Sequence, residues 1–358
     1  MRVAVFAVVL VCVTACMPAA PVSGAQSGVI FMYHHVDATT PRSTSISPQD
    51  FDAQIAWLAE QGFSVLPLLE LLEALASGAE LPERSVAITF DDGYRSVLTA
   101  AAPRLAERDW PFTVFVNTEA IDAGYQGYLS WAELRRLGAQ GATIGNHSVS
   151  HTHLVRELNG ESRGDWQRRV RAEVTEAEQR LAAEVGDYLI PVFAYPYGEY
   201  TAEIKAIVRD QDLYALGQQS GAVGPMSDFY ALPRYPVAEG LSLDDFAQRA
   251  RSRALPASLV GAEQHILNAD EPRPALNFAV AAEPDIRLTE LACYASGQGR
   301  MQLEWQDEST VSARPMADLR VGRSKVNCTA PSASGGGVYY WYGHLWMRRL
   351  ADGSWYDE

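Results

Sequence analysis

Residues 86–93 read Val86-Ala87-Ile88-Thr89-Phe90-Asp91-Asp92-Gly93. The first five are apolar or β-branched and predict a buried strand, which ends abruptly in two carboxylates and a glycine. The backbone turns where a strand ends, so both carboxylates can reach one cleft. Two like charges this close are unfavourable unless a cation lies between them or they do different work. We therefore expect one carboxylate to bind a metal ion and the other to take a proton.

A second polar cluster supplies further ligands for such an ion. It reads Gly145-Asn146-His147-Ser148-Val149-Ser150-His151 and follows the short apolar run Ala142-Thr143-Ile144. The spacing of His147 and His151 predicts a helical turn that presents both imidazoles on one face. Two imidazoles and a carboxylate, with open positions for water, are typical of a catalytic Zn²⁺ site. Each motif alone is more often a turn or a structural histidine pair, but together, each after a predicted strand, they favour a metal site.

Both motifs resemble those of a known enzyme family. Thr89-Phe90-Asp91-Asp92-Gly93 and His147-Ser148-Val149-Ser150-His151 are similar to the first two motifs of the polysaccharide deacetylase (NodB-homology) family, carbohydrate esterase family 4. The resemblance extends over roughly residues 28–255. It implies that Asp91 is the catalytic base. It also implies that Asp92 and the two histidines bind a divalent metal, Zn²⁺ first and Co²⁺ or Ni²⁺ as alternatives.

A third motif of the same family has a changed counterpart here. Phe193-Ala194-Tyr195-Pro196-Tyr197-Gly198 resembles the family pattern Arg-Pro-Pro-Tyr-Gly, which implies that the backbone N–H of Tyr197 binds the oxyanion. Ala194 stands where the family has an arginine that orients the base. Arg234 follows the next predicted strand, and we expect it to pair with Asp91 and keep that carboxylate ionised. The alternative for Arg234 is a surface salt bridge.

The general acid is expected at the end of the first strand. Histidine titrates near neutral pH, so a histidine facing the cleft can serve as the acid. Most of the family takes it from a late Leu-x-His motif, and no good copy precedes residue 256. Exported poly-N-acetylglucosamine deacetylases resemble a circular permutation with this motif at the start, and Met32-Tyr33-His34 fits that placement. The resemblance therefore implies His34, with His35, or a capping or core role for His34, as the alternatives.

From residue 28 onward the pattern alternates strand and helix. Repeated βα units predict a parallel sheet, either open or closed. The resemblance implies an α/β fold, a distorted (β/α) barrel of about seven strands with the motifs at the carboxyl ends of its strands. Strands are expected at residues 29–33, 63–66, 86–90, 112–116, 142–144, 192–194 and 213–216. Helices are expected at residues 48–61, 68–76, after the strand at 86–90 through about 108, and at 130–140, 164–185, 202–210 and 243–253.

The sequence changes in character at residues 256–358. Short apolar segments separated by Gly, Pro and Ser predict a small β-sandwich-like domain there. Cys293 and Cys328 most simply form a disulfide in an oxidising compartment, worth about 4 kcal/mol in the chain-entropy model. Aromatic residues in this part are interpreted either as a sugar-stacking surface or as core and interface. They are Trp305, Tyr339, Tyr340, Trp341, Tyr342, Trp346 and Trp355.

Residues 1–16 have the features of an export signal. A short apolar run, too short to span a membrane stably, leads to Val13-Thr14-Ala15-Cys16, which resembles a bacterial lipobox with Cys16 as the lipidated residue. The alternative is cleavage after Ser23-Gly24-Ala25. Residues 17–27 are expected to form a tether. The mature chain is expected to be lipid-anchored in the periplasm, at the outer membrane, or alternatively soluble in the periplasm or secreted.

Composition narrows the possible functions. The chain has 358 residues and a net charge of −15, which argues against nucleic-acid binding and suits either a cationic polymer or simple solubility. We expect metal-dependent N-deacetylation of an N-acetylglucosamine polysaccharide, first of all poly-β-1,6-N-acetylglucosamine, with an exopolysaccharide export system as a candidate partner. The alternatives are deacetylation of peptidoglycan, chitin oligomers or acetylxylan, and a non-catalytic glycan-binding lipoprotein.

Overall fold

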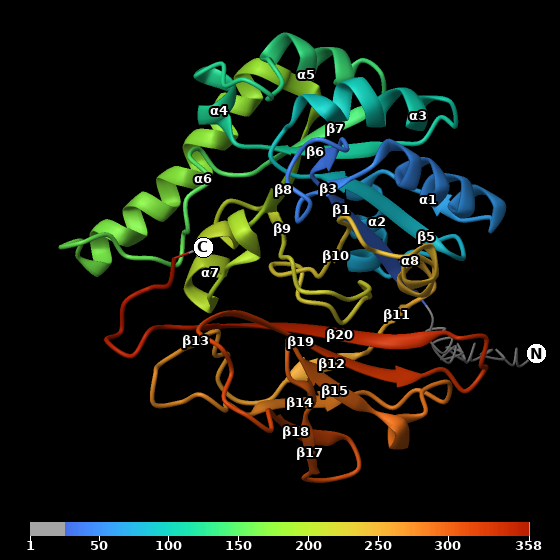
Figure 1. Cartoon of the computed structure of the whole chain (residues 1–358), viewed down its shortest axis with the longest axis vertical. Coiled ribbons are helices and arrows are strands. Elements are labelled where there is room, and N and C mark those ends of the chain that lie inside the picture. Colours follow the sequence, from blue (N-terminus) through green and yellow to red (C-terminus); the bar gives the residue numbers. More distant parts are fainter. Residues whose placement is uncertain (1–25, 358) are drawn as a thin grey trace, which may run out of the picture.

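A curled parallel sheet lies at the centre of the upper half of the molecule in Figure 1. A computed structural model of the chain describes residues 26–357. Strands Gly28–Tyr33 and Ser85–Phe90 are buried at every position, as expected for strands covered on both faces. The strand order is β10-β1-β5-β6-β7-β8-β9, β4 also pairs with β5, and all pairs are parallel. The strands are β1 (Gly28–Tyr33), β4 (Ser64–Val65), β5 (Ser85–Phe90), β6 (Phe112–Val116), β7 (Ala142–Asn146), β8 (Leu189–Ala194), β9 (Tyr214–Leu216) and β10 (Tyr235–Pro236).

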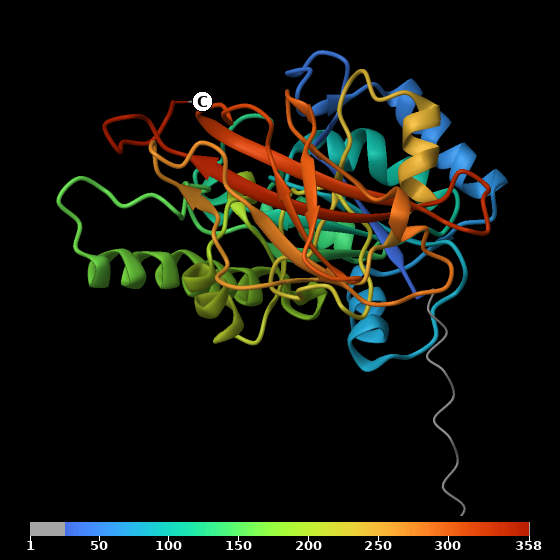
Figure 2. The ribbon, with the colours of Figure 1, turned by 90° about the horizontal axis from the view of Figure 1, so that it is seen from below.

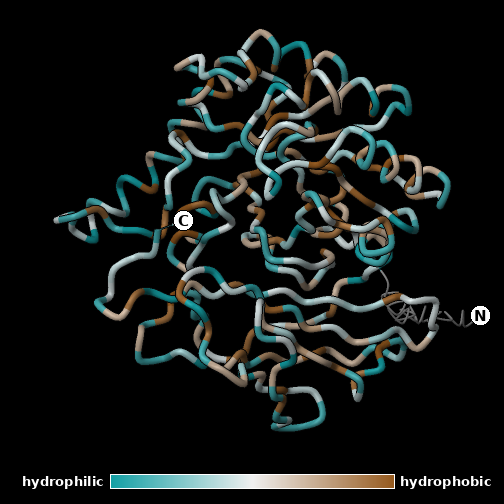
Figure 3. The backbone as a smooth tube through the Cα atoms, viewed as in Figure 1, coloured by the Kyte–Doolittle hydropathy of each residue, from teal (hydrophilic) through white to brown (hydrophobic). Residues whose placement is uncertain are grey.

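Helices surround this sheet (Figures 1 and 2). Their starts follow local sequence signals: Ser47 caps the first helix ahead of Pro48, and Ser130 and Glu133 form a capping box at the start of another. Along the longest helix, buried residues recur every three or four positions from Trp166 to Val185, and hydrophilic segments mark its outer side (Figure 3). The helices are α1 (Pro48–Glu60), α2 (Leu68–Ser77), α3 (Ala102–Ala106), α4 (Thr118–Asp122), α5 (Trp131–Gly138), α6 (Arg163–Val185), α7 (Ala202–Arg209) and α8 (Leu243–Ala250).

The expected distorted (β/α) barrel is confirmed, and its sheet is curled rather than continuously closed. Among the described residues β9 does not pair with β10. Instead, the chain loops back after β9 and then runs parallel to it, so that Leu216 forms a parallel bridge with Leu232. This segment leads to Arg234 and then to β10, which pairs with β1. The irregular closure therefore delivers an arginine to the interior of the half-barrel.

Two further sheets lie below the half-barrel in Figure 1. One has the order β11-β20-β19-β15-β16, with β13 also on β20, and the other has the order β12-β14-β18-β17. Phe278, Val311, Val326 and Trp346 are among the buried residues that form a core between them. The strands are β11 (Arg253–Ala254), β12 (Ala257–Leu259), β13 (Ile266–Leu267), β14 (Leu276–Val280), β15 (Ala292–Ala295), β16 (Gly299–Arg300), β17 (Gln302–Trp305), β18 (Thr310–Arg314), β19 (Gly322–Pro331) and β20 (Tyr339–Arg348).

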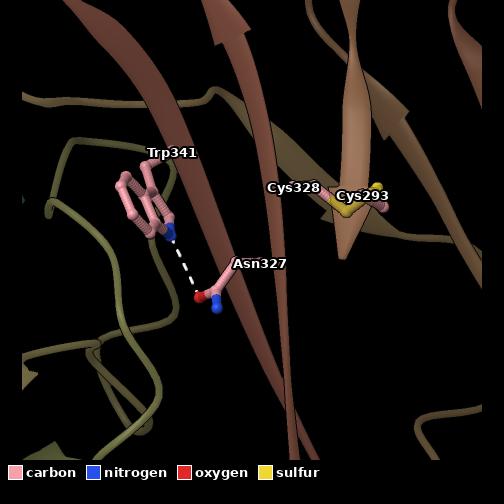
Figure 4. The surroundings of a disulfide bond; sticks show 4 residues. All are labelled: Cys293, Asn327, Cys328 and Trp341. Carbon is pink, nitrogen blue, oxygen red and sulfur yellow. Dashed lines mark hydrogen bonds between the residues drawn. A yellow bond between two sulfur atoms is a disulfide. The ribbon is translucent and has the colours of Figure 1, made fainter. Parts of the chain in front are cut away.

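The predicted disulfide is confirmed. Cys293 and Cys328 face each other across β15 and β19 and are joined by a disulfide bond (Figure 4). Asn327 and Trp341 lie on the opposite side of the strands, where the indole N–H donates to the Asn327 side chain at 3.1 Å. Trp341 packs edge-on against Tyr235 of β10 with ring centroids 5.2 Å apart. This aromatic residue therefore belongs to the contact between the sheets and the half-barrel.

Several sequence expectations need correction. The helix expected between the strand at 86–90 and about residue 108 begins at Arg95 and is not a regular α-helix, because a π-helical turn over Val97–Ala101 runs into α3. Two further strands, β2 (His35–Val36) and β3 (Ser45–Ile46), form a separate parallel pair that the alternating pattern did not indicate. Tyr340 and Trp346 are core residues, whereas Trp305 is 40% exposed.

The N-terminal predictions fall on residues that the structure does not describe. The signal at residues 1–16 lies wholly outside the described part, and so does most of the tether at 17–27. Between residues 26 and 357 no helix has the length and apolar character needed to cross a membrane.

Candidate metal centre

Neighbouring strand ends bring the predicted polar residues to one edge of the sheet. The backbone ladder continues one residue past β5, because Asp91 N donates to Tyr33 O at 2.9 Å. It also continues past β7, because His147 N donates to Val116 O at 3.0 Å. His34, which follows β1, therefore lies beside the Asp91–Asp92 pair. Barrel sites occur at these carboxyl ends of the strands.

Asp92, His147 and His151 form a compact triad. Asp92 Oδ1 lies 3.3 Å from His147 Nε2 and 3.3 Å from His151 Nε2, and the three ligand atoms lie within 4.8 Å of one another. Two ligands about 2.1 Å from one ion at a tetrahedral angle are about 3.4 Å apart, close to the two separations seen here. Within residues 26–357, Asp92 Oδ1 and His147 Nε2 are buried without a well-formed hydrogen bond. Buried polar atoms normally have a partner, so the triad fits a divalent metal ion.

The imidazoles meet through a strained loop rather than the predicted helical turn. No helix forms over residues 147–153, so that prediction is wrong. Ser148 and His151 have φ values of 71° and 54°, and Asn146 Oδ1 accepts from Ser148 N at 2.9 Å. Side-chain hydrogen bonds thus replace the helical ones. Asp92 also has a left-handed backbone, with φ of 72°, and such non-glycine conformations cluster at functional sites.

Two members of the triad are held in forms that bind a metal ion, whereas His147 is shifted the other way: burial lowers its pKa, but the carboxylates of Asp92 and Asp91 outweigh burial and the net direction is up. His147 Nδ1 donates to Ala194 O at 2.7 Å, which leaves its Nε2 as the atom that faces Asp92. Burial, with His147 beside it, lowers the pKa of His151 to about 4, so this imidazole is neutral at neutral pH. Burial raises the pKa of Asp92, but the neighbouring imidazoles of His147 and His34 outweigh it and hold that pKa well below its usual range. A carboxylate and a neutral imidazole are the forms that ligate metal.

Arg234 and Asp91 form a fully buried bidentate ion pair. The two Arg234 terminal nitrogens donate to the two Asp91 oxygens at 2.6 and 2.7 Å, and both side chains are 0% exposed. Arg234 also donates to Gly217 O at 3.0 Å, which fixes the plane of the guanidinium. Burial raises the pKa of Asp91, but the charge and hydrogen bonds of Arg234, together with the neighbouring histidines, outweigh burial, and the net direction is down. Asp91 is therefore held as a carboxylate beside the triad.

The two candidate acids occupy different surroundings. The ring of His35 stacks on Tyr94 with centroids 3.6 Å apart, and His35 N donates to Thr44 O as part of the β2–β3 pair. Burial and the charge of His34 lower the pKa of His35. His34 is partly buried and close enough to influence the charges of Asp91 and Asp92. Of these two carboxylates, His34 acts on both and His35 on Asp92 alone, so the choice of His34 as the acid stays a prediction.

Tyr197 lies beside His151 of the triad. It has a left-handed backbone, with φ of 59°, inside a short turn at Pro196–Gly198 that directly follows β8 and Tyr195. Its ring lies 4.7 Å from that of His151 and stacks on His153 at 3.8 Å. A cleft of about 300 Å³ borders this group and is lined by Asn117, Glu119, Ala120, Tyr125, Tyr128, Val149, Ser150, His151 and Tyr197. A cavity of about 360 Å³ between the half-barrel and β20 is lined by none of the predicted site residues.

Comparison with known proteins assigns the half-barrel. Residues 78–216 match the family described as Polysaccharide deacetylase. The chain carries a polysaccharide deacetylase domain. By family it is a hydrolase, and the matched residues include Asp91, Asp92, His147, His151 and Tyr197. His34 and Arg234 lie outside the matched range, so their assignment depends on the geometry described above.

Individual relatives of the polysaccharide deacetylase domain support this assignment. The chain is 27% identical over 214 residues to the "Putative polysaccharide deacetylase YxkH" of Bacillus subtilis, covering 60% of this chain and 72% of that protein. It is 26% identical over 262 residues to the "Poly-beta-1,6-N-acetyl-D-glucosamine N-deacetylase" of Escherichia coli, covering 62% of this chain but only 38% of that protein. The solved structure of IcaB from Ammonifex degensii aligns with a TM-score of 0.56 and 25% identity, covering 63% of this chain and 97% of that one.

Some residues around the deacetylase triad were not found from the sequence. Tyr94, Tyr125 and Tyr128 frame the cleft, and the Tyr125-x-x-Tyr128 pair in a loop between Gly124 and Leu129 was a signal that went unused. Glu199 is a fully buried carboxylate that pairs with His153 at 2.7 Å. Its role was not visible, because no local pattern marks a charge as buried.

Proposed function

We propose that this chain removes acetyl groups from the N-acetylglucosamine units of a polysaccharide, with poly-β-1,6-N-acetylglucosamine as the first candidate. The observation that carries the proposal is an ionised Asp91 beside the Asp92–His147–His151 triad in a polysaccharide deacetylase domain. The printed name of the Escherichia coli relative supports the choice of substrate. Because that relative is matched over 38% of its length, the substrate is part of the proposal.

The triad would hold a divalent metal ion, Zn²⁺ first and Co²⁺ or Ni²⁺ as alternatives. Asp92 Oδ1 and the Nε2 atoms of His147 and His151 are the ligand atoms. A carboxylate with two imidazoles and open positions is typical of catalytic zinc. When bound, such an ion supplies Lewis acidity towards the acetyl carbonyl and lowers the pKa of water.

The remaining residues would carry the protons and the developing charge. Asp91 accepts a proton from water as the water oxygen bonds to the acetyl carbon. The backbone N–H of Tyr197 donates to the acetyl oxygen as negative charge develops there. His34 donates a proton to the nitrogen as the carbon–nitrogen bond breaks. The products are acetate and a free glucosamine amine. Arg234 keeps Asp91 ionised between turnovers.

The cleft suits a sugar chain. Tyr125, Tyr128 and Tyr197 line it, and Tyr125 is 55% exposed. Exposed rings offer an apolar face to a sugar and a hydroxyl at the rim. Export, a lipid anchor at Cys16 and an exopolysaccharide export system as partner belong to the same proposal, since such a polymer lies outside the cytoplasm.

The test is acetate release by the purified protein with Zn²⁺, Co²⁺ or Ni²⁺ added. The substrates are β-1,6- and β-1,4-linked N-acetylglucosamine oligomers, peptidoglycan and acetylxylan. We expect release from the β-1,6 oligomers, loss on chelation and recovery when metal returns. Release from another substrate alone would keep the chemistry and replace the substrate. Metal-independent glycan binding without any acetate release would instead support the glycan-binding lipoprotein.

Two variants separate the roles of the site residues. Asp91→Asn removes the proton acceptor, so acetate release should vanish while the protein still binds one metal ion. His151→Ala removes a ligand, so both metal and activity should be lost. Metal content is measured on the same preparations. Full activity of the Asp91→Asn protein would exclude Asp91 as the base.

A further inference from the structure

A residue of the C-terminal sheets reaches the candidate active site. Arg323 lies in β19, and its Nη1 donates to the backbone carbonyl of Tyr197 at 2.7 Å. The centre of its guanidinium lies 5.6 Å from the centroid of the Tyr197 ring. The two residues are 126 positions apart in sequence. One side chain therefore contacts both the backbone and the ring of the residue proposed to bind the oxyanion.

The Tyr197 turn needs such support. Its left-handed backbone, with φ of 59°, is unfavourable for a tyrosine and persists only where the surroundings hold it. On one face the ring is held by His153 at 3.8 Å. The neighbouring His151 ring lies at 4.7 Å. A shift of this turn would therefore move the Tyr197 ring, which lies beside the candidate ligand His151, as well as the Tyr197 N–H.

A buried carboxylate extends the contact. Glu199, two residues after Tyr197, is fully buried, and its Oε2 accepts from His153 Nδ1 at 2.7 Å. Its Oε1 accepts from the hydroxyl of Tyr356 at 2.8 Å and lies 3.9 Å from Arg323 Nε. A buried carboxylate is tolerated only with such partners. Two of its three partners come from the C-terminal part of the chain.

We propose that Arg323 is a positioning residue of the active site. By holding the Tyr197 carbonyl, it keeps the turn in the orientation in which the Tyr197 N–H can donate to the oxyanion. This inference rests on the proposed deacetylation. Tyr356 and Glu199 secure the other end of the same turn. The C-terminal sheets therefore complete the active site of the half-barrel, in addition to any part they play in binding polymer.

The kinetic test compares three variants of the full-length protein. Arg323→Met removes the donor and keeps most of the side-chain length, and we expect kcat for acetate release to fall about tenfold or more, with KM nearly unchanged. Arg323→Lys keeps a charged donor and should recover much of the loss. Arg348→Met is the matched control, because among the described residues the hydrogen bonds of Arg348 run to Leu319 O and Ala269 O, both inside the C-terminal part. Its kcat should stay near that of the parent protein.

A second measurement does not depend on activity. Amide hydrogen exchange over residues 195–200 should become about tenfold faster in Arg323→Met and stay unchanged in Arg348→Met. Tyr356→Phe, which removes the hydrogen bond to Glu199, should give a smaller change in the same direction, and it replaces Arg323→Met if that variant does not fold. Equal exchange and equal kcat in Arg323→Met and Arg348→Met would overturn the proposal. If the parent protein releases no acetate at all, the proposed function fails, and the exchange data alone decide whether Arg323 holds the turn.

Discussion

Asp91 has both carboxylate oxygens bound by one guanidinium, and neither group is exposed. Removing one partner leaves an unpaired buried charge, which typically costs about 3–5 kcal/mol. Arg234→Met should therefore lower the free energy of unfolding by about that amount and reduce acetate release, because Asp91 would then take up a proton. Urea unfolding measures the first effect. Adding Asp91→Asn to the Arg234→Met variant should recover part of the free energy of unfolding. If the double variant were instead less stable than Arg234→Met, the buried-pair interpretation would be contradicted.

The same pair has a predictable dependence on pH. The net pKa of Asp91 is lowered in the folded protein, so the pair stabilises above the ordinary aspartate pKa and loses its effect as pH falls through the folded value. Without Arg234, burial is opposed only by the neighbouring histidines. We therefore expect the pKa of Asp91 to rise in this variant, which then gains stability as Asp91 takes up a proton. The stability difference between parent and Arg234→Met should therefore narrow from about pH 7 to about pH 4. A difference that widens towards acid would contradict the assignment.

His34 and His35 provide a paired comparison at the residue scale. His34→Ala removes the proposed proton donor, so kcat should fall by about 100-fold or more while metal content stays constant. His35→Ala removes a ring that stacks on Tyr94 and should have a much smaller effect on kcat. Acetate release and metal content are measured for both. A larger loss in His35→Ala would transfer the acid role to His35.

At the scale of elements, β7 is positioned by close packing around a glycine. A Cβ on Gly145 would lie 2.3 Å from the Phe115 ring and 3.2 Å from the carbonyl oxygen of Val192. Gly145→Ala should therefore cost about 1–3 kcal/mol and disturb His147, two residues further on. Gly164→Ala in α6 is the control, because the nearest atom would be 3.6 Å away. It should be neutral or slightly stabilising. Thermal unfolding of both variants tests this, and equal midpoints would contradict the packing argument.

Elements with strong local signals were predictable, and those without them were not. Apolar runs followed by polar motifs located β5 and β7 and, with them, the three residues of the candidate metal site. In contrast, β19 has alternating burial, but its buried positions include the small residues Gly322, Ser324 and Ala330, so no hydrophobic alternation marks it. The His147–His151 spacing suggested a helical turn because periodicity alone cannot distinguish it from a strained loop. The Arg323–Tyr197 contact joins distant segments, which no local pattern reveals.

At the scale of the whole molecule, hydrogen bonds and ring packing join the half-barrel to the C-terminal sheets. The Tyr356 hydroxyl donates to Glu199 Oε1 at 2.8 Å, and the Trp341 ring packs on Tyr235. Arg323 reaches Tyr197 from the same sheet. Unfolding of the C-terminal sheets would therefore remove contacts that hold the backbone of the half-barrel. We therefore expect the two parts to unfold together rather than in sequence.

The disulfide tests this expectation. Cys293 and Cys328 are 35 residues apart, and a cross-link of that length stabilises by about 4 kcal/mol in the chain-entropy model. Cys293→Ala combined with Cys328→Ala should lower the unfolding midpoint. Because the sheets also hold the Tyr197 turn, tryptophan fluorescence and loss of metal should follow one shifted transition in the variant. Fluorescence changing well before metal is released would mean that the sheets unfold alone and that the half-barrel keeps its metal centre without them.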